Sequence, residues 1–188
     1  RAADYPLTFV LINPINRRLT ELLRTTAVRP THVTLTSFVV GLAAAWAANG
    51  CAARGAFGWG LVSVLLIFAS HVLDALDGDL ARNTDRASSF GAGLDAILDR
   101  AIEVAMVLAI AFGLGERLAL VGGLYCASAV LIYYYATDAH VGAGVAPSER
   151  ASISVPTGTP TTIKIGLFEP FLYGLPLANM LGLGMQAL

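Results

Sequence analysis

The chain has 188 residues, of which 56% are hydrophobic and only 13% are charged, and its formal net charge is −1. Soluble domains usually contain about 45–50% apolar and about 25% charged residues, so this composition excludes an ordinary soluble domain and a disordered chain. The near-neutral charge provides no basic field for nucleic acid, and we expect no such partner. The composition predicts an all-α, polytopic bundle of membrane-spanning helices, each needing roughly 20 apolar residues.

The amino-terminal part of the chain is mixed in character. Residues 1–30 are predicted to form a juxtamembrane segment, which is followed by a transmembrane domain over residues 31–188. Between Pro14 and Arg24, apolar side chains recur at helical spacing beside several arginines. This pattern is typical of an amphipathic helix that lies in the membrane interface.

Five apolar segments follow the juxtamembrane helix. The predicted spans are residues 31–49, 56–80, 90–112, 118–137 and 163–181. A turn at residues 113–117 and polar loops at residues 82–89 and 138–162 separate the later spans. The tail after residue 181 is too short to cross a bilayer, so either the protein has five spans or a sixth is missing from the carboxyl terminus.

The basic residues predict how the helices are oriented. With the amino terminus inside the cell, only Arg54 and Arg117 lie outside, which fits the positive-inside rule. The basic residues placed on the cytoplasmic side are Arg1, Arg17, Arg18, Arg24, Arg29, Arg82, Arg86, Arg150 and Lys164. The loop at residues 82–89 is therefore predicted to face the cytoplasm.

The most informative segment is residues 74–100, DALDGDLARNTDRASSFGAGLDAILDR, where acidic residues enter two predicted spans. A charge within a span costs about 2.5–3.5 kcal/mol on insertion scales, so it needs a partner or a function. Asp74 and Asp77 are three residues apart, and Asp95 and Asp99 are four apart. Helical spacing places each pair on one face of its helix.

The register of the two helices predicts that the four carboxylates converge. An antiparallel hairpin that turns at Arg86 brings Asp74 level with Asp99. The same turn brings Asp77 level with Asp95. Four carboxylates would repel one another strongly at low dielectric, and hard divalent cations with oxygen ligands would relieve that repulsion. Mg²⁺ typically binds through carboxylates together with substrate phosphates.

Small and charged neighbours accompany the acids. Gly78 and Gly91 lie on the acidic faces and leave room for a ligand, and Arg82 offers a planar fork of donors that suits phosphate. Arg100 is predicted to point away from the acidic face of its helix. Glu103, one turn below Asp99, is predicted to be paired or protonated and not catalytic.

These residues resemble the signature of the CDP-alcohol phosphotransferase family, D-x2-D-G-x2-A-R-x8-G-x3-D-x3-D. The matching positions, in order, are Asp74, Asp77, Gly78, Ala81, Arg82, Gly91, Asp95 and Asp99. The start of the first span, Pro30-Thr31-His32-Val33-Thr34, is similar to the Pro-Asn-x-x-Thr pattern of the family, with Thr31 in place of Asn. The resemblance implies six spans, of which the last is missing here, and a homodimer.

The resemblance also implies a reaction and roles for individual residues. In the family, a CDP-linked donor binds at two metal ions, Mg²⁺ or Mn²⁺, and an acceptor hydroxyl displaces CMP in the synthesis of phospholipids. Asp74, Asp77 and Asp95 are then metal ligands, while Asp99 is both a ligand and the general base. The residues implied to line the cytidine diphosphate are Gly78, Ala81, Arg82 and Gly91.

The sequence leaves the substrates open. Residues 77–100 and Asn16-Arg17-Arg18 are similar to the family branches that use inositol phosphate, but Tyr133–Tyr135 and Asp138 stand where those branches carry basic residues. Glycerol phosphate, serine or a neutral polyol is therefore an alternative acceptor. The donor is CDP-diacylglycerol or another CDP-alcohol. Arg150 and Lys164 either hold an anionic acceptor or are ordinary basic surface residues.

An alternative function is a cation transporter, because acidic residues within spans often mark ion pathways. A conduction path needs polar groups through the full thickness of the membrane, whereas the acids here cluster in one half. A scaffold protein with a decayed site is a third interpretation, and the intact motif argues against it.

Overall fold

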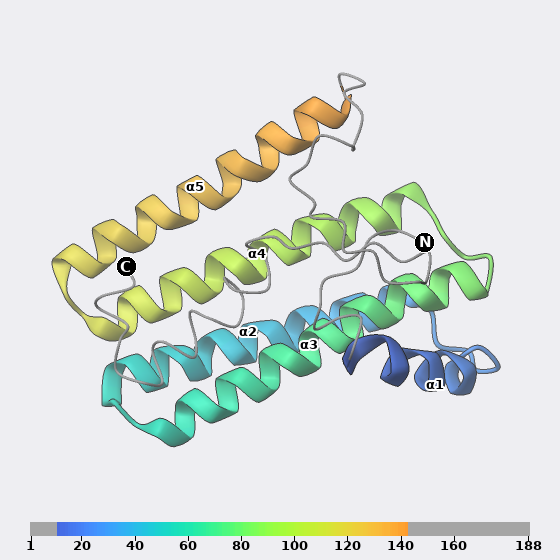
Figure 1. Cartoon of the computed structure of the whole chain (residues 1–188), viewed down its shortest axis with the longest axis horizontal. Coiled ribbons are helices and arrows are strands. Elements are labelled where there is room, and N and C mark those ends of the chain that lie inside the picture. Colours follow the sequence, from blue (N-terminus) through green and yellow to red (C-terminus); the bar gives the residue numbers. More distant parts are fainter. Residues whose placement is uncertain (1–10, 143–188) are drawn as a thin grey trace, which may run out of the picture.

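The computed structural model describes residues 11–142, and within this range the chain forms helices and no strand (Figure 1). The helices are α1 (Asn13–Leu23), α2 (Pro30–Arg54), α3 (Phe57–Asn83), α4 (Ser89–Leu114) and α5 (Arg117–Gly142). The all-α prediction is confirmed for this part of the chain. The predicted span at residues 163–181 lies outside the described residues.

Helices α2, α3 and α4 form the body of the structure. Helix α2 packs along both α3 and α4, and α5 packs against α4 and diverges from it toward its carboxyl end (Figure 1). Helix α1 packs against α3 near the α3–α4 loop, and we call this the α1 end of the bundle (Figure 1). At the opposite end, Gly55 (φ 60°) and Gly115 (φ 69°) terminate α2 and α4 in the left-handed conformation that glycine adopts without strain.

Helix α2 is longer than predicted. Its expected end at residue 49 is wrong, and the helix continues to Arg54. The polar Asn49 does not interrupt it, because its side-chain Nδ2 donates a 2.8 Å hydrogen bond to the carbonyl of Ala109 in α4. A polar side chain that finds a partner inside the bundle gives the helix no reason to stop. Helix α3 likewise runs to Asn83 and not 80, so Arg82 belongs to its last turn.

Helix α5 also passes its predicted end. The polar residues Thr137, Asp138 and His140 favoured a loop from residue 138, but the helix continues to Gly142. Polar composition alone does not end a helix, and neither glycine nor proline stands between residues 124 and 141 to break it. The predicted loop boundary at residue 138 is therefore wrong.

The core lies where α2 meets α3 and α4. Small side chains on α2 allow close contact, and a Cβ atom built on Gly41 would lie 2.6 Å from Cδ1 of Ile102. The buried residues of this cluster are Ala44, Ala45, Ala48, Ile67, Ile102, Met106 and Ile110. Because Ile102 follows the acidic segment of α4 directly, this packing fixes the helix that carries two of the acids.

Hydroxyl groups link α2 to α3 along their length. Ser63 Oγ donates to the carbonyl oxygen of Ala44 at 2.9 Å. Closer to the α1 end, Ser37 Oγ donates to the carbonyl of Ser70, and Ser70 Oγ donates to the carbonyl of Ser37, each at 2.9 Å. Buried polar groups that find partners in this way fix the register of the two helices.

The predicted amphipathic helix is confirmed as α1. Its Leu19 and Leu23 pack on a buried cluster that includes Leu76 and Leu80 of α3. A second apolar stripe is exposed and consists of Ile15 and Leu22 in α1 and Leu11 just before the helix. One face of α1 therefore holds it to the bundle, and the exposed stripe is free to meet an apolar surface.

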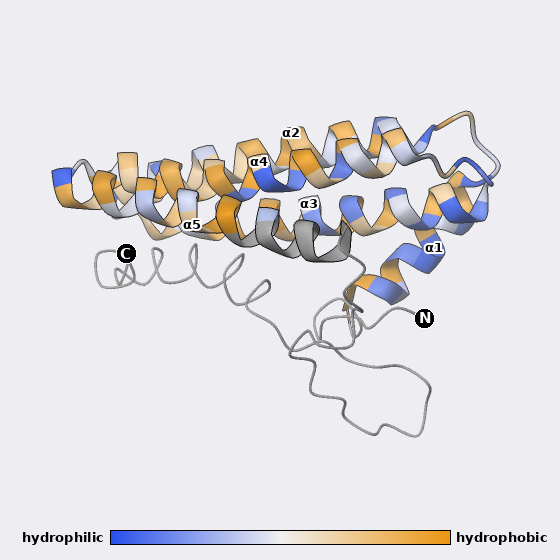
Figure 2. Ribbon diagram, turned by 90° about the horizontal axis from the view of Figure 1, so that it is seen from above, coloured by the Kyte–Doolittle hydropathy of each residue, from blue (hydrophilic) through white to orange (hydrophobic). Residues whose placement is uncertain are grey.

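By length and composition, α2 and α3 are apolar enough to cross a membrane, and the apolar stretch of α5, Arg117–Ile132, is shorter. Hydrophobic colours dominate the long helices in Figure 2, and more hydrophilic residues gather on α1 and at the α1 end. Large apolar side chains are exposed on several helices, among them Val39, Trp46, Leu65, Phe112, Leu124 and Tyr125.

Candidate active site

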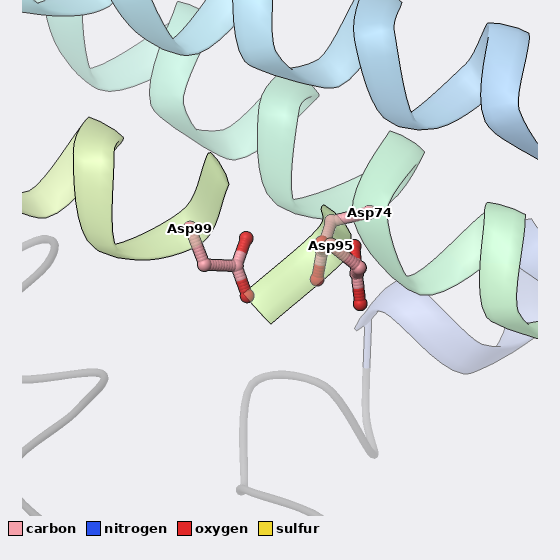
Figure 3. A group of neighbouring side chains, drawn as sticks. All are labelled: Asp74, Asp95 and Asp99. Atoms are coloured by element: carbon pink, nitrogen blue, oxygen red, sulfur yellow. The ribbon is translucent and has the colours of Figure 1, made fainter. Parts of the chain in front are cut away.

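Three carboxylates from two helices converge. Asp74 of α3 and Asp95 and Asp99 of α4 each offer a carboxylate oxygen, and these atoms lie within 4.8 Å of one another. Figure 3 shows Asp74 beside Asp95, with the carboxylate of Asp99 reaching toward them from one turn along α4. We call these residues the carboxylate trio. All three are half-buried.

A short loop brings the trio together. The chain reverses between Asn83 and Ser89, so the predicted turn about Arg86 is confirmed. Ser88 caps α4 by accepting a 3.0 Å hydrogen bond from the backbone nitrogen of Gly91, which fixes where α4 begins. Asp85 adopts a left-handed conformation (φ 54°), which an aspartate tolerates better than most residues.

The trio matches the donor set of a hard divalent cation. Oδ1 of Asp95 is buried and has no hydrogen-bond partner in the part of the chain that the structure describes. An unpartnered buried acceptor is costly, because it has lost its contact with water. Mg²⁺ and Mn²⁺ favour oxygen ligands of this kind. The residues present therefore fit such an ion.

Asp77 stands apart from the trio. It is buried in α3, and the hydroxyl of Thr34 in α2 donates a hydrogen bond to its Oδ2. The predicted convergence therefore holds for three carboxylates as one group, and Asp77 lies on the wall of the neighbouring cavity together with Asp95.

A cavity of about 560 Å³ opens at the α1 end, between the starts of α2 and α4 and the end of α3. All four residues that the resemblance implied for the nucleotide line it: Gly78, Ala81, Arg82 and Gly91. A Cβ atom on Gly78 would lie 3.2 Å from Nη1 of Arg82, so the absence of a side chain lets this guanidinium lie close to α3.

Arg82 is held loosely. Its Nη2 atom lies 2.8 Å from Oδ1 of Asp79, and the two side chains are 67% and 33% exposed. Exposed pairs of this kind contribute about 0–1 kcal/mol. The guanidinium is therefore easily redirected to a stronger anion such as a phosphate.

Several cavity residues were missed by the sequence analysis as site residues, among them Arg29, Thr34, Arg86 and Ser88. Nη1 of Arg86 donates to the carbonyl of Val28 at 3.4 Å and so joins the α3–α4 loop to the segment before α2. The excess of arginine near the α1 end was the available signal for Arg29 and Arg86. Together with Arg82, they give the cavity three cationic side chains.

The prediction that Arg100 points away from the acids is wrong. Its Nη2 atom lies 3.3 Å from Oε1 of Glu103 and 3.7 Å from Oδ2 of Asp99. The guanidinium reaches Glu103, one turn further along α4, because a largely buried guanidinium requires carboxylate partners. The predicted pairing of Glu103, which is buried, is confirmed. Arg150 and Lys164 lie outside the described residues.

The comparison with known proteins agrees with the family that the motif resembles. Residues 27–182 match the family model described as CDP-alcohol phosphatidyltransferase. The archaetidylinositol phosphate synthase of Methanothermobacter thermautotrophicus is 32% identical over 150 residues, which are 78% of this chain and 69% of that protein.

Two longer proteins are also similar, each named bifunctional IPC transferase and DIPP synthase. The protein from Rubrobacter xylanophilus is 31% identical over 161 residues, 85% of this chain. The protein from Aquifex aeolicus is 34% identical over 85 residues, 45% of this chain. The match spans only 34% and 18% of the length of these two relatives.

Proposed function

The chain belongs to the CDP-alcohol phosphatidyltransferase family, and on this basis we propose that it transfers a substituted phosphate from a CDP-linked donor to an acceptor alcohol. CMP is released, and the reaction serves phospholipid synthesis. The observation that carries the proposal is the carboxylate trio, which lies beside a cavity lined by the remaining residues of the family motif.

Two apolar helices and membership of this family indicate a membrane protein. We infer that the helices form a polytopic bundle whose α1 end faces the cytoplasm. The exposed apolar side chains along α2 to α5 support burial in lipid, and the basic residues near the α1 end support the orientation. The sixth span and the homodimer stay predictions.

Asp74, Asp95 and Asp99, together with Asp77 on the cavity wall, would hold two divalent cations, Mg²⁺ or Mn²⁺. Such ions neutralise the charge of a diphosphate and stabilise CMP as a leaving group. The Oδ1 atom of Asp95 supports this assignment, since it is a buried oxygen that has no hydrogen-bond partner in the described residues.

The residues of the chain then have distinct tasks. Arg82 exchanges Asp79 for a phosphate oxygen of the donor, while Arg29 and Arg86 make the cavity attractive to anions. Gly78 and Gly91 leave room for the diphosphate.

Asp99 is proposed as the general base. The acceptor oxygen forms a bond to the phosphorus that carries the donor's alcohol group, and the bond from that phosphorus to the oxygen of CMP breaks. The proton of the acceptor hydroxyl passes to the carboxylate of Asp99.

Inositol phosphate is the acceptor that the comparisons favour, because one relative is named archaetidylinositol phosphate synthase. Arg150 and Lys164 are then proposed to hold the acceptor's phosphate. Glycerol phosphate, serine and neutral polyols are the competing acceptors, and CDP-diacylglycerol is the first donor to test.

The transporter alternative is not supported by the core. Beyond Glu103, the buried residues toward the opposite end include Met106, Ile110 and Ala48. Among the described residues of that half, no buried side chain carries a charge. A cation path would require polar groups there as well.

The test is CMP release by the purified full chain in detergent or liposomes. CDP-diacylglycerol and other CDP-alcohols are combined with inositol phosphate, glycerol phosphate, serine and inositol, with and without Mg²⁺ or Mn²⁺. We expect metal-dependent CMP release that requires one particular acceptor. CDP binding without turnover for every pair would indicate a decayed site, and cation flux in liposomes would indicate the transporter.

A further inference from the structure

The hydrogen bond between Thr34 and Asp77 connects two helices at the wall of the cavity. Thr34 lies one turn after the start of α2, and Asp77 lies two turns before the end of α3. The two residues are only 7% and 5% exposed. The Thr34 hydroxyl donates to Oδ2 of Asp77, and both residues line the cavity.

The Thr34 hydroxyl has two acceptors within reach but only one hydrogen. The carbonyl oxygen of Pro30 lies 3.2 Å from Thr34 Oγ1, which is the usual bond of a helical threonine to the preceding turn. A bond to a carboxylate is roughly twice as strong as one to a neutral acceptor. The hydrogen therefore goes to Oδ2 of Asp77.

The other hydroxyl bonds between α2 and α3 differ in kind. Ser63, Ser37 and Ser70 each donate to a backbone carbonyl, so their effect is on the packing of the helices. Thr34 reaches a carboxylate that faces a cavity. Groups that hydrogen-bond a metal ligand fix its orientation, and replacing them typically costs about 10–100-fold in metal affinity or activity.

We propose that Thr34 is a positioning residue for Asp77: it fixes Oδ2 so that Oδ1 is presented to a divalent cation at the cavity wall. This inference rests on the proposed function, because it assumes that Asp77 is a metal ligand. Thr34 touches neither the cation nor the reacting atoms in this scheme, and it acts through Asp77.

Three variants separate the hydroxyl from the shape of the side chain. Thr34→Val keeps the volume of the side chain and removes the hydrogen-bond donor. Thr34→Ala removes both the donor and the branched side chain. Thr34→Ser keeps the hydroxyl. Ser63→Ala is the matched control, because it removes a hydroxyl bond from the same pair of helices away from the cavity.

The measurement is the affinity of the purified full chain for Mn²⁺. The signal of free Mn²⁺ in electron paramagnetic resonance reports how much of the ion is bound. We expect Thr34→Val and Thr34→Ala to weaken Mn²⁺ binding about 10–100-fold. Thr34→Ser should restore affinity close to that of the unaltered protein. Ser63→Ala should lower the thermal midpoint of unfolding and leave Mn²⁺ affinity unchanged.

The inference is overturned if Thr34→Val binds Mn²⁺ as tightly as the unaltered protein, or if Thr34→Ser loses as much affinity as Thr34→Val. Equal loss in Ser63→Ala would also overturn it, because the cause would then be the packing of α2 on α3. If the unaltered protein binds no Mn²⁺, both this inference and the proposed metal site are wrong. If Mn²⁺ affinity depends on Thr34 but no acceptor releases CMP, the inference stands and the proposed transfer fails.

Discussion

Asp99 and Asp77 sit in different surroundings, although both belong to the same motif. Asp99 is part of the carboxylate trio and lies near the guanidinium of Arg100, and Asp77 is held by Thr34 at the cavity wall. A carboxylate in the trio is flanked by two others that can still hold a cation when its own charge is removed. We therefore expect the two positions to respond differently to the same substitution.

Asp99→Asn should keep much of the affinity for Mn²⁺ and CDP, because Asp74 and Asp95 remain. Turnover should fall by about 10²–10⁴-fold, which is the typical effect of removing a positioned base. Asp77→Asn should instead weaken Mn²⁺ and CDP binding together. Metal titration followed by calorimetric CDP binding on both variants makes the comparison, and equal loss of metal affinity in the two would identify Asp99 as mainly a ligand.

At the scale of the element, the approach of α2 to α4 depends on glycine. A Cβ atom on Gly113 would lie 2.6 Å from the carbonyl oxygen of Asn49 and 2.6 Å from Cβ of Ala52. Backbone cannot move aside as a flexible side chain does, so an added methyl group would push the two helices apart. A Cβ atom on Gly93, in the same helix, would meet no other atom within 4 Å.

Gly113→Ala should lower the free energy of unfolding by about 1–3 kcal/mol, the usual cost of overpacking. Gly93→Ala should leave it unchanged or raise it by up to about 1 kcal/mol, because alanine is the better helix former. Thermal or denaturant unfolding in detergent, monitored by circular dichroism, measures the stability of both variants. Similar stability of the two variants would mean that α2 and α4 are not in close contact at this point.

The sequence could predict the features that depend on the spacing of neighbouring residues along the chain. The helix spacing of the acids and the short segment between them predicted the hairpin, its turn and the meeting of Asp74 with Asp99. Contacts that depend on packing were not accessible. The bond from Thr34 to Asp77 requires the register of α2 against α3, and the return of Arg100 toward Glu103 requires a side-chain conformation that spacing does not specify.

The ends of helices were the least predictable feature for a related reason. Asn49 and Asp138 are polar and favoured loops in the sequence. Within the structure, Asn49 bonds to α4 and the helix runs past it, and α5 continues through Asp138. For Asn49 the deciding partner is Ala109, which lies far away in the chain and cannot be read from the local pattern.

At the scale of the whole molecule, the two ends of the bundle are predicted to face opposite sides of a membrane. Ala87 lies in the α3–α4 loop at the α1 end, and Glu116 lies in the α4–α5 turn at the opposite end. With the native Cys51 and Cys126 replaced by alanine, Ala87→Cys should react with a membrane-impermeant maleimide only when the cytoplasmic face is accessible. Glu116→Cys should react in intact cells.

The control for this labelling is Ala44→Cys, since Ala44 is fully buried in the core and should stay unlabelled from either side. Reaction of Ala87→Cys in intact cells would reverse the proposed orientation. If both loop cysteines react from one side, the chain between them does not cross the membrane an odd number of times. That result would contradict the assignment of α4 as a membrane span.

The carboxylate trio draws its members from two consecutive helices joined by the short loop between Asn83 and Ser89. Closing so short a loop costs little conformational entropy, and contacts of low sequence separation form early in folding. The acidic half of the site can therefore assemble once α3 and α4 have packed on α2, without any contribution from α5. In a nascent chain, the proposed cation site would then form independently of the segments that follow α4.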